Sequence, residues 1–440
     1  MNPIDRREFL GTSLAAGLSM GLAGNSRRVP GANDKIVLGI MGVSRSNYGK
    51  AATLKNRGRG AQLAAGCAGL PMAEIAYLCD VDQRHLDATM SEIAPLQAKP
   101  PKAVRDFRKI LDDKAVDAIV IATPDHWHAP AAILACAAGK HVYVEKPCCH
   151  NPHEGELLVA AARKHGRVVQ QGTQRRSAPG HIEAVDALRK GAIGKVIEAR
   201  CYYLFHDRPS IGRGKPAPVP ESLDWSLWQG PAPEREFRDN FVPYHWHWFW
   251  HWGTSELGNN GIHTLDVARW GLGVDLPVQV SAIGGRLRYE DDQETPDTTN
   301  AVYKFAEGPL ITWEGRSWGG KSPADVSQQV VFHGEKGTLA ISGGDYTIYD
   351  PGGTEVAKGA GEVGDAVHLQ NFFDAVRGTA KATAEVEEGF KSTLLCHLGN
   401  ISYRTGRTIG FDPKNRRIVG DREAEGFWSR EYRAGWEPKI

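Results

Sequence analysis

The sequence predicts an α/β protein whose amino-terminal part contains a doubly wound parallel sheet. Between residues 35 and 172, short apolar runs alternate with segments of helical length. Glycines gather after the first apolar run, at Gly42 and again from Gly58 to Gly60. From residue 278 onward, segments of strand length dominate. The alternation indicates parallel strands with crossover helices, and the later strands predict a second, differently built part.

Length and composition limit the functions that need to be considered. A chain of 440 residues is too long for one core, so two or three domains are expected. The formal net charge of +1 gives no basic footprint for nucleic acid or an anionic membrane. None of the seven cysteines forms a C-x-x-C pair, so neither a disulfide framework nor a metal site is expected. A reactive thiol at Cys148 or Cys149 is a minor alternative.

The amino terminus has the features of an export signal. Arg6 and Arg7 precede a mild apolar run, Leu14 to Ala23, which is too short to span a bilayer. This pattern resembles a twin-arginine signal, and a disordered basic terminus is the alternative. We assign residues 1–32 to the signal and a linker. A periplasmic or otherwise exported protein without stable membrane insertion is the expectation.

The glycine-rich stretch departs from the dinucleotide fingerprint G-x-G-x-x-G. Gly42 ends the first expected strand, over 35–42, but the next glycines are those of Gly58-Arg59-Gly60. We interpret residues 44–55 as an insertion in the phosphate loop. Gly60 would then open a helix over 61–68 whose amino-terminal dipole faces the pyrophosphate. The cofactor-binding candidates in this stretch are Gly42, Gly58, Arg59 and Gly60.

An acidic residue indicates which dinucleotide binds. Asp80 ends the second expected strand, over 74–80, at about the distance from Gly60 where a carboxylate binds ribose hydroxyls. A carboxylate there repels a 2′-phosphate, so NAD is expected and NADP is less favoured. Arg84 could weaken that preference.

The alternation continues to residue 172. Helices are expected over 84–93, 107–111, 130–138 and 154–165, and strands over 118–124, 141–147 and 167–171. Open α/β sheets bind ligands at the carboxyl ends of their strands. Residues at these ends extend the set of cofactor-binding candidates, which adds Thr123, Pro124, His128, Glu145, Lys146 and Gln174.

Lys146 is the first catalytic candidate. It follows a buried strand, and Pro147 ends that strand because proline cannot donate a backbone hydrogen bond. A lysine at this edge stands where the fold binds its ligand, and desolvation beside NAD⁺ can depress its pKa. Taken alone, an exposed loop lysine is the plainer interpretation.

A block of aromatic residues over 244–256 follows a helix over 179–190, a strand over 195–204 and a long loop over 206–243. Aromatic faces pack on sugar rings while polar tips bind hydroxyls, so we expect sugar contacts from Trp248, Trp250, His251 and Glu256. The alternative is an aromatic core segment. Metal binding is not expected, because no cysteine or aspartate completes a ligand set.

His263 is the second catalytic candidate. A turn and helix over 258–270 place it on one face with Asp266, and Arg269 is a candidate partner for Asp266. A pKa near neutrality suits removal of a hydroxyl proton. The remaining strands are expected over 278–287, 300–305, 310–318, 328–333, 337–342 and 346–349, with helices over 366–377 and 387–405. The tail from residue 420 is expected to cover a neighbouring subunit.

These motifs together resemble the glucose–fructose oxidoreductase/inositol dehydrogenase (Gfo/Idh/MocA) family. The resemblance rests on the order and spacing of Thr123-Pro124 with His128, of Glu145-Lys146-Pro147, and of Asn259-x-Gly261-x-His263-x-x-Asp266. It implies an NAD(P)-binding Rossmann domain, assigned to 33–172. A substrate-binding and oligomerisation domain with a large, mostly antiparallel sheet would then occupy 173–440. A homodimer or homotetramer is the assembly that the resemblance implies.

The resemblance also implies that Lys146 and His263 act at the reacting carbon. Asn259 stands where the family usually has aspartate, and it cannot take a proton. The export signal and the aromatic block are typical of secreted, sugar-directed members. We expect Arg175, together with Glu145 and Gln174, to position cofactor and substrate.

The expected activity is hydride transfer between NAD(P) and a ring carbon of a sugar, glycoside or related polyol. Because the periplasm holds no large dinucleotide pool, the cofactor should remain tightly bound and cycle. A redox-neutral NAD-dependent glycosidase that oxidises, eliminates and re-reduces is the first alternative. A non-catalytic sugar-binding relic of the fold is the second.

Overall fold

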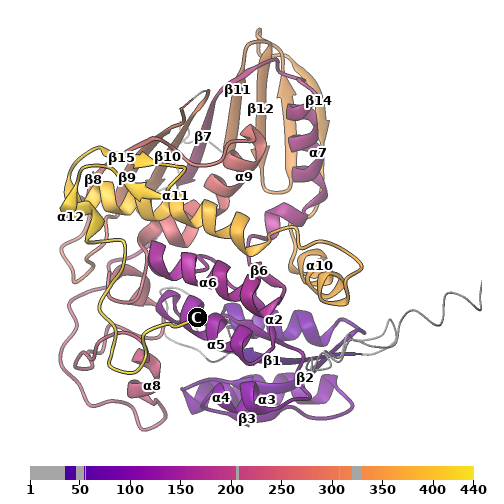
Figure 1. Cartoon of the computed structure of the whole chain (residues 1–440), viewed down its shortest axis with the longest axis vertical. Coiled ribbons are helices and arrows are strands. Elements are labelled where there is room, and N and C mark those ends of the chain that lie inside the picture. Colours follow the sequence, from indigo (N-terminus) through magenta and orange to yellow (C-terminus); the bar gives the residue numbers. More distant parts are fainter. Residues whose placement is uncertain (1–34, 46–53, 55, 205–207, 307, 320–328) are drawn as a thin grey trace, which may run out of the picture.

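The computed structural model describes residues 35–45, 54, 56–204, 208–306, 308–319 and 329–440. The expected export signal lies outside these residues, and so does most of the expected insertion over 44–55. Two sheets organise the described chain, with helices packed on and between them (Figure 1).

The first sheet has six parallel strands in the order β3-β2-β1-β4-β5-β6. Its strands are β1 (Ile36–Met41), β2 (Ala73–Cys79), β3 (Lys102–Val104), β4 (Ala118–Ile121), β5 (His141–Val144) and β6 (Val169–Gln171). Continuous apolar runs such as that of β4 are buried along their whole length, as expected for strands covered on both faces. The order reverses between β1 and β4, which makes a topological switch point at their carboxyl ends.

Helices cover both faces of this sheet. They are α2 (Arg59–Ala68), α3 (Gln83–Ile93), α4 (Arg108–Asp112), α5 (Asp125–Ala137) and α6 (Pro152–His165), with a 3₁₀ turn over Ala94–Leu96. Helix α5 begins five residues before the expected 130, because Pro124 precedes it and Asp125 places a carboxylate in its first turn. Strand β3 was not expected, since its three residues carry little apolar signal.

The second sheet has ten strands in the order β14-β13-β12-β11-β7-β10-β9-β8-β15-β16. Only its β10–β7 pair is parallel among the described strands. The strands are β7 (Val196–Leu204), β8 (Gln279–Gly285), β9 (Thr298–Lys304), β10 (Leu310–Arg316), β11 (Val330–Gly334), β12 (Gly337–Ser342), β13 (Asp345–Tyr349), β14 (Glu355–Gly359), β15 (Ile409–Asp412) and β16 (Arg417–Ile418). The predicted Rossmann domain followed by a mostly antiparallel sheet is confirmed.

Helices α7 (Pro179–Arg189), α9 (Ile262–Leu272) and α11 (Val386–Thr405) pack on one face of the second sheet (Figure 1). A π-helical turn, Leu257–Gly261, leads into α9. Helix α11 also packs on α6, and α10 (Asp365–Arg377) packs on α2, so the later chain returns to the first sheet. These contacts bring residues of both parts to one pocket.

The expected loop over 206–243 contains α8 (Trp225–Gln229), and the aromatic block after it begins with a 3₁₀ turn, His245–Trp248. Its aromatic side chains form a separate core cluster, which includes Trp225, Trp228, Phe241 and Trp252. Trp225 and Trp228 stack with ring centroids 4.7 Å apart. The segment is therefore held by its own apolar core rather than lying loosely over the site.

The tail, which was expected to cover a neighbouring subunit, packs in part on its own chain. After α12 (Arg422–Glu425) the tail runs back to the first sheet (Figure 1). There Trp436 packs edge-to-face on Trp127, with centroids 5.1 Å apart, and Arg430 Nη2 donates to the His126 carbonyl at 3.1 Å. The two large apolar rings bury each other within one chain. Among the described residues, no helix is long and apolar enough to cross a membrane.

Candidate active site

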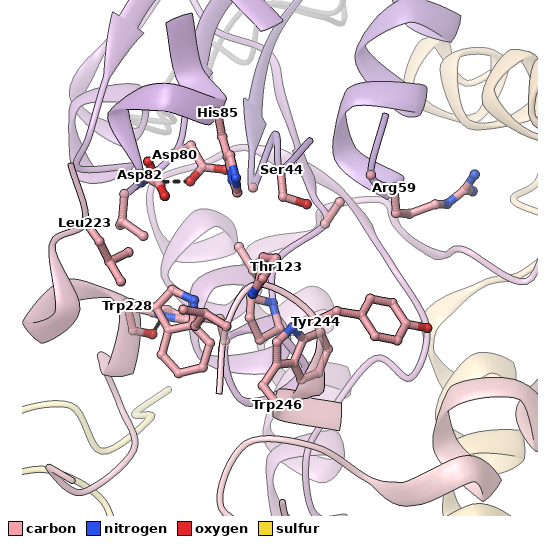
Figure 2. A pocket seen from close by; sticks show the side chains of 18 of the residues that line it. Ser44, Arg59, Asp80, Asp82, His85, Thr123, Leu223, Trp228, Tyr244 and Trp246 are labelled. Carbon is pink, nitrogen blue, oxygen red and sulfur yellow. Dashed lines mark hydrogen bonds between the residues drawn. The ribbon is translucent and has the colours of Figure 1, made fainter. Parts of the chain in front are cut away.

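A pocket of about 810 Å³ opens at the carboxyl edge of the parallel sheet (Figure 2). Residues that follow β1, β2, β4 and β5 line one side of it, among them Gly42, Asp80, Thr123, Glu145 and Lys146. The later chain supplies the opposite wall, with Trp228, Tyr244, Trp246 and Asn259. The pocket therefore lies at the switch point, where open α/β sheets bind ligands.

The glycines expected to cradle a pyrophosphate lie together. Gly42 has a φ of +85°, and a Cβ there would stand 2.7 Å from the Ala122 carbonyl oxygen. A Cβ on Gly60 would stand 1.6 Å from the Gly42 carbonyl oxygen, so the start of α2 touches the loop after β1. Gly58 is the N-cap of α2. The helix amino terminus and the glycine cradle fit a bound pyrophosphate despite the altered spacing.

Asp80 lies at the end of β2, beside Asp82 and His85 on the pocket wall (Figure 2). Its Oδ1 accepts a hydrogen bond from the Asp82 amide at 2.9 Å. Burial raises the pKa of Asp80, while His85 acts in the opposite direction. Arg84 is held by Asp82, with Nη2 and Oδ2 2.6 Å apart. Arg84 also lines the pocket, and its positive charge is paired with Asp82 rather than with Asp80.

Arg59 joins three segments at the far end of the pocket. Its Nε donates to Glu145 Oε1 at 2.7 Å, and its two terminal nitrogens donate to the Asp365 carboxylate at 2.7 and 2.8 Å. Burial would lower the pKa of Arg59, but Glu145 and Asp365 outweigh burial and raise it. Glu145 also stands beside Gly172, where a Cβ would lie 2.7 Å from Oε1. This network fixes the start of α2 against the end of β5.

His128 connects the ends of β4 and β5. Its Nδ1 lies 2.6 Å from the Pro147 carbonyl oxygen, and its Nε2 lies 2.8 Å from the Thr123 carbonyl oxygen. The hydroxyl of Thr123 is buried and has no hydrogen-bond partner among the described residues. His128, Thr123 and Pro124 all line the pocket. The unpaired hydroxyl and the glycine cradle both fit a dinucleotide.

Lys146 reaches from the end of β5 toward the opposite wall. Its Nζ donates to the Asn259 backbone carbonyl and, at 3.1 Å, to Asn259 Oδ1. The Tyr244 side chain is hydrogen-bonded to Asn259 as well. Burial lowers the pKa of Lys146, although Glu145 and Asp125 act against that shift. Lys146 is therefore an amine held in the pocket, with easier deprotonation than an exposed lysine.

His263 lies near this group but does not line the pocket. Burial lowers its pKa well below the usual range, and the cations Lys146 and Arg175 add to the shift. Its Nδ1 is buried without a hydrogen-bond partner among the described residues. His263 is thus held neutral near Lys146, with one ring nitrogen unpaired and outside the pocket lining.

Two expected positioning residues stand away from the pocket lining. Gln174 Nε2 lies 3.4 Å from Asp365 Oδ1. The guanidinium of Arg175 is desolvated, and this burial lowers its pKa to about 10. Their neighbour Arg176 binds Asp266, with Nε 2.8 Å from Oδ2. The expected pairing of Asp266 with Arg269 is wrong, because the Asp266 carboxylate binds Arg176 instead.

The aromatic block contributes less to the pocket than expected. Trp248 is only 1% exposed, and the Arg208 guanidinium lies 3.6 Å from its ring centroid. Its expected sugar contact is therefore wrong, and the aromatic-core alternative holds for this residue. Trp250 and His251 line a second cavity instead. Glu256 is buried, bonded to Asn260 and 4.0 Å from Arg208, outside the pocket lining.

Other aromatic residues take the place expected for these side chains. Tyr244, Trp246 and His247 from the same block line the pocket, and Trp228 comes from α8 (Figure 2). Within the aromatic block, the 3₁₀ turn over His245–Trp248 sets the directions of the rings. In such a turn, side chains do not alternate between two faces as they do in a strand. The block itself was the only signal in the sequence that could have pointed to Tyr244.

All seven cysteines are free and buried. Burial raises the pKa of Cys149, which argues against the reactive-thiol alternative there. Among the described residues, no group of three or more histidine, cysteine or acidic side chains could hold a metal ion.

The fold and the glycine cradle define a dinucleotide-binding oxidoreductase. Residues 36–173 match the model of the oxidoreductase family with an NAD-binding Rossmann fold, and residues 210–438 match that of the family's C-terminal alpha/beta domain. The chain belongs to the Gfo/Idh/MocA oxidoreductase family, as its motifs indicated.

Named relatives include two kinds of sugar-directed enzyme. A levoglucosan dehydrogenase from Pseudarthrobacter phenanthrenivorans is 28% identical over 231 residues, covering 51% of this chain and 48% of that protein. An alpha-N-acetylgalactosaminidase from Tannerella forsythia is 29% identical over 143 residues, covering 31% of this chain and 30% of that protein. The matched region thus spans about half or less of these curated relatives.

A solved structure confirms the architecture. The WlbA dehydrogenase from Bordetella pertussis, in complex with NADH and UDP-GlcNAcA, superposes with a TM-score of 0.62 at 21% identity. The match covers 86% of this chain and 99% of that one. At this identity the likeness establishes the fold alone.

Proposed function

We propose that this protein is an NAD-dependent oxidoreductase that transfers a hydride to or from a ring carbon of a sugar, glycoside or related polyol. The observation that carries the proposal is Lys146. Its amine is held by Asn259, on the pocket wall that also carries Tyr244 and Trp246. Bound NAD would supply the hydride acceptor or donor. The levoglucosan dehydrogenase relative supports a carbohydrate substrate.

The position of each residue in or near the pocket indicates its proposed role in binding or proton transfer. Gly42, Gly60 and the start of α2 would hold the pyrophosphate, and Asp80 would bind the ribose hydroxyls. Lys146 would hold the substrate oxygen and exchange a proton with it, since its pKa is lowered by burial. The neutral imidazole of His263 would accept the proton that the substrate oxygen gives up. Asn259 would orient Lys146 rather than carry charge.

A substrate screen tests the proposal. The purified chain is incubated with NAD⁺ and a panel of sugars, glycosides and inositols, and NADH is followed by absorbance. We expect at least one ring substrate to yield NADH, and Lys146→Met to abolish that yield. Substrate-independent NADH formation, or full activity in Lys146→Met, would contradict the proposal.

A redox-neutral glycosidase is the second candidate, favoured by the similarity to the Tannerella forsythia alpha-N-acetylgalactosaminidase. It would release the aglycone after a transient oxidation and leave no net NADH. Chromogenic aryl glycosides distinguish the two activities. Release of the aryl group that requires bound NAD but yields no NADH would favour the glycosidase.

Cellular context and assembly belong to the same proposal. We infer export through the twin-arginine route from residues 1–32, and a tightly bound, cycling cofactor with NAD preferred to NADP. Residues 33–172 and 173–440 would act as the cofactor and substrate domains. Apolar residues on the uncovered face of the second sheet, Ile283 and Val302, are 74% and 40% exposed. They support assembly into a homodimer or homotetramer through that face.

A further inference from the structure

A second cavity, of about 500 Å³, lies behind the wall of the first pocket. Its lining comes from the segment around His150, from the aromatic block, from α11 and from the tail. Trp250 and His251 of the aromatic block, which do not line the first pocket, lie here. The volume suits a ligand of about monosaccharide size.

Arg404, an exposed residue of α11, is one of the residues that line this cavity. Its guanidinium lies between two aromatic rings, 3.9 Å from the centroid of Phe427 and 4.9 Å from that of Trp250. Within the described part of the chain, no hydrogen bond and no ion pair to a carboxylate engages it. Stacking fixes the plane of the guanidinium and leaves its edge for an acceptor.

Arg430 supplies a second cation from the tail. Its Nε lies 3.1 Å from Glu154 Oε1, and its Nη2 donates to the His126 carbonyl at 3.1 Å. These two contacts orient the side chain. Its Nη1 is buried and has no hydrogen-bond partner among the described residues. One donor of a fixed guanidinium is thus left unused beside the cavity.

His150 adds a third polar group. Both of its ring nitrogens are buried without hydrogen-bond partners in the described chain, although the residue lines the cavity. A buried polar group without a partner costs free energy, so unpaired groups that converge on one cavity indicate a ligand. Glu154 pairs with Arg430 Nε, whereas the two acids of the lining form no ion pair with Arg404 or Arg430 in the described chain. Glu234 lies 2.9 Å from Arg433, outside the lining, and Glu431 is exposed.

We propose that this cavity is a second ligand site, which binds a small organic oxyanion through Arg404 and Arg430 with His150 as a further hydrogen-bonding group. The ligand is a molecule of about monosaccharide size that carries a carboxylate or a phosphate. A guanidinium can donate two parallel hydrogen bonds to either a carboxylate or a phosphate. The site does not depend on the reaction proposed for the first pocket.

The two cavities share a wall, which shapes the experiment. Thr254 Oγ1 donates to Asp125 Oδ2 at 2.6 Å, and Asp125 lines the first pocket. Asn400, which lines the second cavity, donates to the Thr254 carbonyl at 2.7 Å. An anion could also enter the phosphate cradle of the first pocket, so binding is measured with saturating NADH present.

Isothermal titration calorimetry of the full chain tests the site. The probes are inorganic phosphate, gluconate and, as the neutral match, glucose. We expect saturable binding of at least one anion, with affinity at least about tenfold weaker in Arg404→Gln because a charged hydrogen-bond donor is lost, and no glucose binding that depends on Arg404. Phosphate binding without gluconate binding assigns a phosphate group, and the reverse assigns a carboxylate.

Matched variants keep the test decisive. Arg422→Gln changes an exposed arginine of the same tail region and should bind like the wild type. His150→Gln serves as the second variant if Arg404→Gln fails to fold, as judged by its melting temperature. Absence of binding by both anions, glucose binding that weakens in Arg404→Gln as much as anion binding does, or wild-type anion affinity in the folded cavity variants would overturn the proposal.

Discussion

At the scale of single residues, the chemistry depends on the environment of Lys146. Replacing it with methionine removes the amine but keeps the length of the side chain. We expect oxidation of the ring substrate to slow by about 10²–10⁴-fold, the usual contribution of a positioned acid or base. The measurement is the steady-state rate with NAD⁺ and the substrate found by screening. Lys109→Met, on the surface helix α4, is the control and should leave the rate unchanged.

The pH dependence of the same rate gives an independent prediction. Because burial lowers the pKa of Lys146, its neutral form appears at a lower pH than in an exposed lysine. Oxidation should therefore rise as the pH increases through this lowered pKa. Lys146→Arg keeps its charge throughout and should lose the rising limb. A wild-type limb retained in Lys146→Arg would assign it to another group.

Sequence reasoning located residues well where the backbone alone decides their position. Asp80 and Lys146 end strands of a parallel sheet, so their place at the pocket followed from the strand pattern. The strand pattern does not predict the side-chain positions of Trp248, Gln174 and Arg175. Their side-chain directions are set by a 3₁₀ turn and by tertiary packing against Arg208 and Asp365. No periodicity in the sequence encodes those contacts.

At the scale of elements, the contact between α2 and the loop after β1 decides whether a dinucleotide binds. Gly60→Ala would place a Cβ 1.6 Å from the Gly42 carbonyl oxygen, which the backbone can relieve only by moving the helix. We expect loss of NAD binding in a calorimetric titration, together with a lower melting temperature.

The control for this variant lies on the same helix. At Gly66 a Cβ would stand 3.3 Å from Leu369 Cδ1, the far end of a flexible side chain. Gly66→Ala should therefore keep NAD binding, and alanine favours the helix by about 0.5–1 kcal/mol. Normal NAD affinity in Gly60→Ala would mean that the cradle assignment is wrong.

Most long elements were predicted from the sequence because their apolar patterns are local. Helices α6 and α11 and strands β7 to β12 appear close to their expected ranges. Strands β14, β15 and β16 escaped prediction, since each pairs at or near the sheet edge and buries few residues. Pairing with a distant strand, rather than local pattern, makes these segments strands.

At the scale of the whole molecule, buried histidines make stability depend on pH. Burial lowers the pKa of His181 and His397 to about 4. When the chain unfolds, each regains its ordinary pKa, so the unfolded state binds more protons below pH 6.5. The free energy of unfolding therefore falls as the pH drops, by about 2 kcal/mol for each histidine between pH 7 and pH 5.

Urea denaturation at the two pH values measures this effect. His181→Leu should lose its share of the pH dependence, because leucine takes no proton in either state. His153→Leu, on the surface of α6, is the control and should keep the wild-type dependence. A pH dependence unchanged in His181→Leu would show that this histidine is not held neutral in the folded protein.

The central claim is that the first pocket holds NAD for a redox reaction. The most direct measurement is to purify the folded protein, denature it, and identify the released small molecules by mass. The account predicts NAD, close to one molecule per chain, with NADP absent or minor. A protein that releases no dinucleotide and also fails to bind added NAD would contradict the account and leave a sugar-binding relic of the fold.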